Sequence, residues 1–278
     1  AIAVNRPSAL LTADHYGLTS YGRVGKELLR PSTGLLPWIT DYDKLLQEAL
    51  KLLNLADFLV IELGDLVRLE SNKSLGFENI VRSERLLLLS KISNFIEKLL
   101  KEIDLNNTMI IIASPTPKPS TTVAENYLTP IIILNNQMGS GFAYSNSTRR
   151  EGIVVNKDLP ATILDFFELP FQKLIGGNPI TEAGSGENMK LQKLLNLKDN
   201  LVFINLLRPM LLKPYIVLQI ITIIFSFILF FTLSNIIPYF KYWLSLLVAY
   251  PVSLLIMPVF KISNSFFYAS ISITLALT

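Results

Sequence analysis

The sequence predicts an α/β domain with helices on both faces of its sheet, followed by transmembrane α-helices. Short apolar runs typical of buried strands alternate with amphipathic helical patterns in the first 180 residues. After about Leu211 the chain becomes almost continuously apolar. Half of the 278 residues are hydrophobic and the mean hydropathy is +0.43, which is high for a water-soluble domain. The C-terminal excess accounts for that value.

Charge and cysteine content exclude several classes of function. The net charge is only +3, so we expect no nucleic-acid partner. The chain has no cysteine, which excludes disulfides and thiolate metal sites. His15 is the single histidine, so a histidine-rich metal cage is excluded. Because His15 follows Asp14 in a turn-rich segment, we expect a solvated side chain more than a metal ligand.

The first predicted helix begins after Thr40-Asp41, a typical N-cap, and ends near Asn54. One apolar stripe at helical spacing marks its buried face: Leu45, Leu46, Ala49, Leu52 and Leu53. The continuous apolar run over 58–63 then predicts a strand buried on both faces, which leads directly into Gly64-Asp65.

A long helix is predicted over about 77–103, followed by strands over 108–113 and 131–134. Its expected buried side is Ile80, Leu87, Leu88, Ile92, Phe95, Ile96, Leu99 and Leu100. The order of strand, long helix and strand predicts a right-handed βαβ unit in a parallel sheet.

Polar residues follow two of these strands where each strand ends. Glu62 and Asp65 belong to the first, and Ser114 and Thr116 to the next. Ligands bind beyond the carboxyl ends of strands in open α/β sheets. The sequence therefore predicts a site that gathers these four residues along one edge.

The segment over 147–164 carries a second group of candidates. Arg149 and Arg150, with the hydroxyls of Ser147 and Thr148, could clamp an anion, because guanidinium forks match phosphate or carboxylate oxygens. Alternatively, the arginines pair with acidic residues of the same domain. Asp158 is expected to cap a helix over 159–167, with a proline in its first turn.

The C-terminal third is expected to lie in a membrane. Residues 181–210 read as a linker with a short amphipathic helix over 188–197, and 211–278 as the membrane region. Spans are predicted over 215–233 and 242–260, with a truncated third from 265. Buried helices of a soluble protein are the alternative. Since the chain starts without Met and stops within an apolar run, we expect a fragment cut at both ends, or a chain whose leader has been removed.

Few charges flank these spans. Arg208, Lys213 and Lys261 would lie on the side of the domain, and only Lys241 on the other. Taken literally, the positive-inside rule places the domain in the cytoplasm.

Four motifs in order resemble the alkaline phosphatase/sulfatase superfamily: LVIELGD (59–65), IIIASPTP (110–117), LTPIIIL (128–134) and STRREGIVVNKDLPATIL (147–164). More narrowly, the chain is similar to uncharacterised bacterial membrane proteins with an alkaline-phosphatase-like domain. The resemblance covers about 1–180, as an N-terminally truncated domain. It implies an alkaline-phosphatase-like sheet, and a domain outside the cytoplasm, against the charge count.

The departures from the family pattern concern its metal site. Active members hold two zinc ions or one calcium with Asp and His side chains, and use an N-terminal nucleophile. Asp65 matches the first aspartate, but 66–70 reads LVRLE where a histidine is expected. Ser114-Pro115-Thr116 stands where the family has Ser-Asp-His, and proline offers no ligand. A two-metal site therefore cannot be assembled from these residues.

Three functions are consistent with this sequence. The first is a catalytically degenerate, membrane-anchored binding or structural module, with the bilayer and an anionic headgroup or envelope polymer as partners. The second is a membrane-bound hydrolase or transferase of phosphate or sulfate esters. In that case Asp65, Glu62, Ser114 and Thr116 would hold one divalent cation, Mg²⁺, Mn²⁺, Ca²⁺ or Zn²⁺. The third is a transporter or polymerase with a soluble insert.

Overall fold

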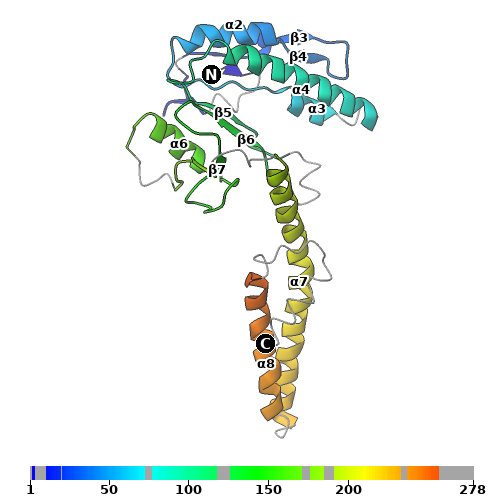
Figure 1. The fold of residues 1–278 in the computed structure, drawn as a ribbon. Helices are drawn as coiled ribbons and strands as arrows, with labels where there is room; N and C mark the ends of the chain where they lie inside the picture. The colour runs from blue at the N-terminus through cyan, green and yellow to red at the C-terminus, as the bar shows by residue number, and fades with distance from the viewer. Residues whose placement is uncertain are drawn as a thin grey trace. The chain divides into compact units, whose positions relative to one another are not determined.

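The computed structural model describes residues 2–3, 11–19, 21–72, 77–117, 126–170, 176–184, 191–232 and 237–256 (Figure 1). The chain divides into two compact units. The N-terminal unit is Ala1–Ile110 with Leu134–Gln137, and the C-terminal unit is Ile111–Ile133 with Met138–Thr278. Each unit is described separately below.

The described residues of the N-terminal unit include the helices α2 (Tyr42–Leu53), α3 (Asp65–Asn72) and α4 (Glu78–Leu100). They also include a 3₁₀ turn and short strands, which are β1 (Ile2–Ala3), β2 (Arg23–Val24), η1 (Lys26–Leu28), β3 (Leu29–Pro31) and β4 (Trp38–Thr40). Strands β1 and β2 pair in parallel, and β3 pairs with β4 in the antiparallel sense.

Helix α2 confirms its sequence prediction at both ends. The Asp41 side chain accepts a hydrogen bond from the Lys44 backbone N–H at 3.1 Å, which satisfies an orphan donor of the first turn. Asn54 is the C-cap. Leu45 and Ala49 are fully buried, as the apolar stripe predicted.

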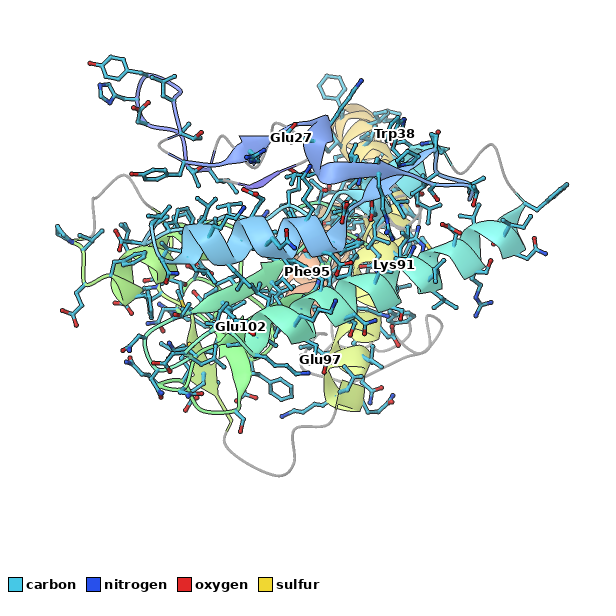
Figure 2. All side chains as sticks on the ribbon, turned by 90° about the horizontal axis from the view of Figure 1, so that it is seen from above. Glu27, Trp38, Lys91, Phe95, Glu97 and Glu102 are labelled. Carbon is cyan, nitrogen blue, oxygen red and sulfur yellow. The ribbon has the colours of Figure 1, made fainter. Side chains whose placement is uncertain are left out.

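Helix α4 packs along α2 and holds the main core of this unit. The fully or nearly buried residues of that core are Leu28, Leu45, Ala49, Phe95 and Leu99. Phe95 lies between α2 and α4, whereas Glu97 lies on the other side of α4 (Figure 2). The predicted buried face was too wide, because Ile80 and Leu87 are 46% and 49% exposed.

The strand predicted over 58–63 is wrong. Only Ile61 forms a β-bridge, and the rest of the run has no strand assignment. Leu59, Ile61 and Leu63 still pack against the core beneath α2 and α4. The apolar contacts that suggested a buried strand are therefore made, but by an irregular segment and without a ladder.

Strands β5 (Ile110–Ala113) and β6 (Ile131–Leu134) pair with each other and match the predicted positions. The Ser114 N–H donates to the Pro130 carbonyl at 3.4 Å, and the Asn135 side chain donates to the Thr108 carbonyl at 3.2 Å. The end of one strand thus meets the start of the other, which is the antiparallel arrangement. Within the described residues the strands form four two-stranded pairs, so the predicted parallel βαβ sheet is not formed there.

In the C-terminal unit, β7 (Phe142–Tyr144) pairs with β8 (Thr181–Ala183) in the antiparallel sense. Residues 181–183 therefore belong to the domain, and the predicted linker begins too early. Helix α6 (Asp158–Phe166) lies between these strands in sequence and confirms the predicted helix to within one residue at each end.

Helix α7 (Leu191–Thr232) is continuous where the sequence predicted a short amphipathic helix followed by a separate span. It contains Pro209 and Pro214. Within the described residues, one stretch, Leu191–Leu229, is long and apolar enough to cross a membrane. Helix α8 (Ile237–Ile256) has a shorter apolar stretch, Tyr242–Val252. The predicted third span and the end of the second, from 257 onward, lie outside the described residues.

Side chains of α7 and α8 satisfy one another's polar groups, and α8 runs alongside α7 (Figure 1). The Tyr215 hydroxyl donates to the Leu247 carbonyl at 2.7 Å and accepts from the Gln219 side chain at 2.8 Å. The Trp243 indole N–H donates to the Thr222 hydroxyl at 3.1 Å. Polar side chains in an apolar pair of helices are costly unless they form hydrogen bonds, and these contacts supply such bonds.

Candidate functional site

Asp65, the matched metal residue of the sequence prediction, is fully buried at the first turn of α3. Its carboxylate accepts hydrogen bonds from the Thr40 backbone N–H (2.9 Å), the Thr40 hydroxyl (3.0 Å) and the Tyr42 hydroxyl (2.7 Å). Arg68, one helical turn further on, forms an ion pair with it. The end of β4 and the start of α2 and α3 thus meet at one carboxylate.

Arg68 joins this group through one of its guanidinium nitrogens. Nη2 donates to Asp65 and to the Thr40 hydroxyl, the latter at 2.9 Å. Its Nε and Nη1 are buried and form no hydrogen bond with the described residues. Burial raises the pKa of Tyr42 well above its ordinary value, and the hydrogen bond to the Asp65 carboxylate raises it further.

These contacts fit a structural role for Asp65 and do not fit a metal ligand. Both carboxylate oxygens already accept protein donors, one of them a cation. Glu62 and Asp65 belong to the N-terminal unit, and Ser114 and Thr116 to the C-terminal unit. The Ser114 hydroxyl donates to the Thr116 carbonyl at 3.1 Å. Across the described ranges, no three histidine or acidic residues cluster in a way that could hold a metal ion.

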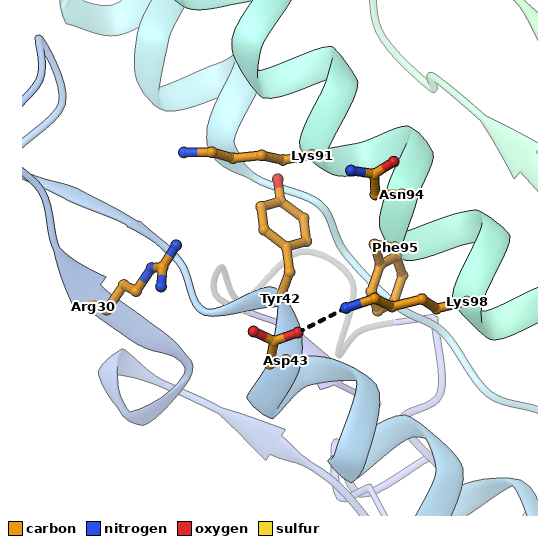
Figure 3. A pocket seen from close by; sticks show the side chains of 7 residues that line it. All are labelled: Arg30, Tyr42, Asp43, Lys91, Asn94, Phe95 and Lys98. Carbon is orange, nitrogen blue, oxygen red and sulfur yellow. Dashed lines mark hydrogen bonds and ion pairs between the residues drawn. The ribbon is translucent and has the colours of Figure 1, made fainter.

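A pocket of about 150 Å³ opens beside Tyr42, between β3, α2 and α4 (Figure 3). The residues that line it are Arg30, Tyr42, Asp43, Lys91, Asn94, Phe95 and Lys98. Three of them are cations and one is a carboxylate. The pocket is therefore positively charged, and it shares the Tyr42 side chain with the Asp65 group.

The cations of the pocket differ in their partners. Lys98 forms an ion pair with Asp43 at 3.0 Å. Arg30 and Lys91 form no ion pair or side-chain hydrogen bond with any described residue, and both line the pocket (Figure 3). This pocket was not predicted from the sequence, although Lys91, Asn94 and Lys98 recur at helical spacing on one face of α4.

Asp158 is a second fully buried carboxylate, and its predicted role was wrong. Helix α6 begins at Asp158 itself, and its N-cap, Lys157, makes no side-chain capping bond. The Asp158 carboxylate instead accepts from the Ser147 hydroxyl (2.5 Å), the Asn178 N–H (3.0 Å) and the Val155 N–H (3.1 Å). It therefore joins the loop before α6 to the segment that precedes β8.

The pKa of Asp158 reflects two opposed effects. Burial acts to raise this pKa, because it disfavours the charged form. The hydrogen bonds from Ser147, Asn178, Val155 and Ser145 stabilise the carboxylate and outweigh burial. The pKa of Asp158 is consequently lowered from its ordinary value.

Of the four side chains in the anion clamp predicted at 147–150, the two hydroxyls already donate hydrogen bonds within the protein. The Ser147 hydroxyl donates to Asp158, and the Thr148 hydroxyl donates to the Ile153 carbonyl at 2.6 Å. Arg149 and Arg150 are exposed and form no ion pair with the described residues, so the alternative of an internal pairing is not seen there. The clamp stays a prediction that rests on the two guanidinium groups alone.

The start of α7 packs on the turn that follows these arginines. Lys193 forms an ion pair with Glu151 at 3.6 Å and lies 5.0 Å from the centre of the Phe142 ring. Gly152 has a φ of +77°, and a Cβ there would lie 2.7 Å from Leu194. A larger residue would be strained at this backbone angle and would displace the end of the Leu194 side chain.

Comparison with protein-family models, with curated proteins and with solved structures finds no match to this chain. The resemblance to the alkaline phosphatase/sulfatase superfamily therefore rests on the four sequence motifs and stays a prediction.

Proposed function

We propose that this chain is a membrane-anchored, alkaline-phosphatase-like domain that binds an anionic ligand and lacks two-metal ester hydrolysis. The observation that carries the proposal is that Asp65 is buried and its carboxylate is already bound by protein donors. The one residue that matches a family metal ligand is fully buried and held by Thr40, Tyr42 and Arg68. The Arg68 guanidinium already pairs with the carboxylate that a metal ion would need as a ligand.

The membrane part of the proposal is supported by α7, which contains an apolar stretch long enough to cross a bilayer. Within the proposal, α8 forms a second span, and the polar contacts between Tyr215 and Leu247 and between Trp243 and Thr222 hold the two helices together. We further propose that the domain lies outside the cytoplasm, as the family resemblance implies.

Ester hydrolysis by a reduced metal site is the competing function. It would require Asp65 to release Arg68, which would leave a buried guanidinium without its counter-charge. No contact among the described residues favours this alternative.

An activity assay on the full chain in lipid nanodiscs tests the proposal. We expect no turnover of phosphate or sulfate monoesters above the buffer rate with Zn²⁺, Mg²⁺, Mn²⁺ or Ca²⁺, and no difference between the native protein and Asp65→Asn. Metal-dependent turnover in the native protein that Asp65→Asn abolishes would overturn it. Circular dichroism of the variant establishes that it is folded.

The orientation can be tested separately, because the chain has no native cysteine. Ser93, exposed on α4, offers a position for a single thiol as Ser93→Cys. We expect a membrane-impermeant maleimide to label this variant in intact cells. Labelling only after permeabilisation would place the domain in the cytoplasm.

A further inference from the structure

We infer that the pocket lined by Arg30, Tyr42, Asp43, Lys91, Asn94, Phe95 and Lys98 binds an oxyanion attached to an apolar group, such as a phosphate or carboxylate on an aromatic or acyl carrier. This inference rests on the proposed function in one respect, which is that the domain binds a ligand. It differs from that proposal in naming the site and the chemistry of recognition.

The charge of the pocket points to an anion. Arg30 from β3 and Lys91 from α4 line the same pocket without an acidic partner among the described residues (Figure 3). An anion bound in this pocket would be attracted by both cations. A guanidinium fork and an ammonium group together match the oxygens of a phosphate or carboxylate.

Two more donors stand at the same pocket. Asn94 lies one helical turn after Lys91 on the same face of α4, and Lys98 one turn further (Figure 3). Lys98 is paired with Asp43, but their side chains are 57% and 74% exposed. Exposed pairs of this kind contribute little stability, so Lys98 can turn from Asp43 to a bound oxyanion at small cost.

The rings of Tyr42 and Phe95 supply the apolar side of the pocket. Their centroids lie 5.9 Å apart, and Phe95 is almost fully buried. The Tyr42 hydroxyl is fixed by Asp65 at 2.7 Å, which holds the ring in place before any ligand binds. A preorganised aromatic surface beside two cations favours an anion that carries an apolar substituent over a bare inorganic ion.

The size of the pocket limits how much of the ligand enters it. Its volume of about 150 Å³ is well below the roughly 300–1,000 Å³ of pockets that enclose drug-sized ligands. The anionic group and the carbons next to it fit, and the rest of the carrier stays outside. Such a site suits the end of a larger molecule as well as a small free ester or acid.

Calorimetric titration of the full chain in nanodiscs of phosphatidylcholine tests this inference. The probes are phenyl phosphate, benzoate, inorganic phosphate and phenol. We expect saturable binding of phenyl phosphate and benzoate, weaker binding of inorganic phosphate, and none of phenol. No saturable binding of any anionic probe would overturn the inference.

Charge variants locate the binding. Lys91→Ala and Arg30→Ala should each weaken phenyl phosphate binding about tenfold, the usual loss for one charge-assisted hydrogen bond. The matched control is Arg82→Ala, which removes one charge from an exposed position of α4 outside the pocket and should change nothing. Equal effects of Lys91→Ala and Arg82→Ala would overturn the inference.

A variant that binds more tightly is informative because misfolding could only weaken binding. Asp43→Asn removes the only carboxylate among the described residues that line the pocket, and it frees Lys98, so we expect phenyl phosphate to bind about two- to fivefold more tightly. Weaker or unchanged binding to a folded Asp43→Asn variant would contradict the inference.

A second titration, in nanodiscs that contain an anionic lipid, distinguishes a lipid headgroup from a soluble oxyanion as the ligand. If nanodiscs that contain phosphatidic acid weaken phenyl phosphate binding, the occupant is a lipid headgroup. If they leave it unchanged, the occupant is a soluble oxyanion of the same chemistry. Release of phenol from phenyl phosphate in the presence of a metal ion would overturn the proposed function and leave the binding site standing.

Discussion

Among the described residues, each of the two compact units contains one fully buried aspartate at the start of a helix, and the two carboxylates are stabilised differently. Asp65 in the N-terminal unit has a cationic partner, Arg68, besides the hydroxyls of Thr40 and Tyr42. Within the part of the chain that the structure describes, Asp158 in the C-terminal unit has neutral donors only, from hydroxyls and backbone N–H groups of the loops before and after α6.

The difference determines what each carboxylate does. The Asp65 charge is balanced by another buried charge, so removing either one leaves the other without compensation. The Asp158 charge is stabilised by several neutral hydrogen bonds, and the loop donors in turn need this carboxylate as their acceptor. Asp65 therefore fixes the mutual position of secondary-structure elements, whereas Asp158 fixes the loop that carries Arg149 and Arg150.

The largest expected effect is that of Asp65→Ala. It leaves the Arg68 guanidinium buried and unpaired, and should lower the free energy of unfolding of the N-terminal unit by about 3–5 kcal/mol. Hydrogen exchange of peptides from α2 and α4 measures this change. The control is Asp57→Ala, at an exposed position of the same unit.

A double variant shows whether charge balance is the cause. Asp65→Ala with Arg68→Leu should be more stable than Asp65→Ala alone, because no buried charge then remains. If the double variant is as unstable as the single one, the comparison between the two aspartates fails.

A smaller loss is expected for Asp158→Asn. The amide cannot accept as strongly from Ser147 and the backbone donors, so the C-terminal unit should lose about 1–3 kcal/mol. Faster hydrogen exchange at the Val155 and Asn178 amides would show it, while Asp165→Asn, on the exposed side of α6, should have no effect. Unchanged protection of both amides would refute the role of Asp158.

Acid should act on the C-terminal unit through Asp158. Because the pKa of Asp158 is lowered in the folded state, its contribution to stability is present above its ordinary value of 3.8. That contribution is lost as the pH falls below 3.8 through the folded-state pKa. The stability difference between the native protein and Asp158→Asn should therefore shrink in this range. A difference that is constant with pH would show that Asp158 does not titrate this way.

Alkali should act on the N-terminal unit through Tyr42, with the smallest effect. The pKa of Tyr42 is raised in the folded state, so its contribution is present below 10.0 and is lost as the pH rises above that value. Tyr42→Phe should cost about 1 kcal/mol at neutral pH, for one lost hydrogen bond. The difference should decrease above pH 10.0 in alkaline urea melts, and a difference that grows there would contradict the assignment.

Local patterns predicted α2, α4 and α6 well, but they missed α3, divided α7 and predicted the sheet poorly. Asp41 and the stripe from Leu45 to Leu53 specify α2 by capping and periodicity, which act within a few residues. The apolar run over 58–63 packs on the core as expected, but strand formation needs a partner that sequence alone does not specify. The same limit explains the antiparallel pairing of β5 and β6, which was expected to be parallel.

The candidate site shows a similar limit. Asp65 and Asp158 were recognised as chemically significant, but their partners Arg68 and Asn178 depend on how separate segments meet. The pocket was not predicted, because Arg30 lies some sixty residues from Lys91 and belongs to a different element. Charges that converge in space without a sequence motif are visible only in the structure.

Metal content tests the central claim most directly. The full chain in nanodiscs is dialysed to equilibrium against Zn²⁺ or Mn²⁺ and its bound metal is determined by elemental analysis, with Asp65→Asn in parallel. We expect both proteins to retain far less than one equivalent, because Arg68 holds the Asp65 carboxylate. One or two equivalents bound by the native protein and lost in Asp65→Asn would contradict the account.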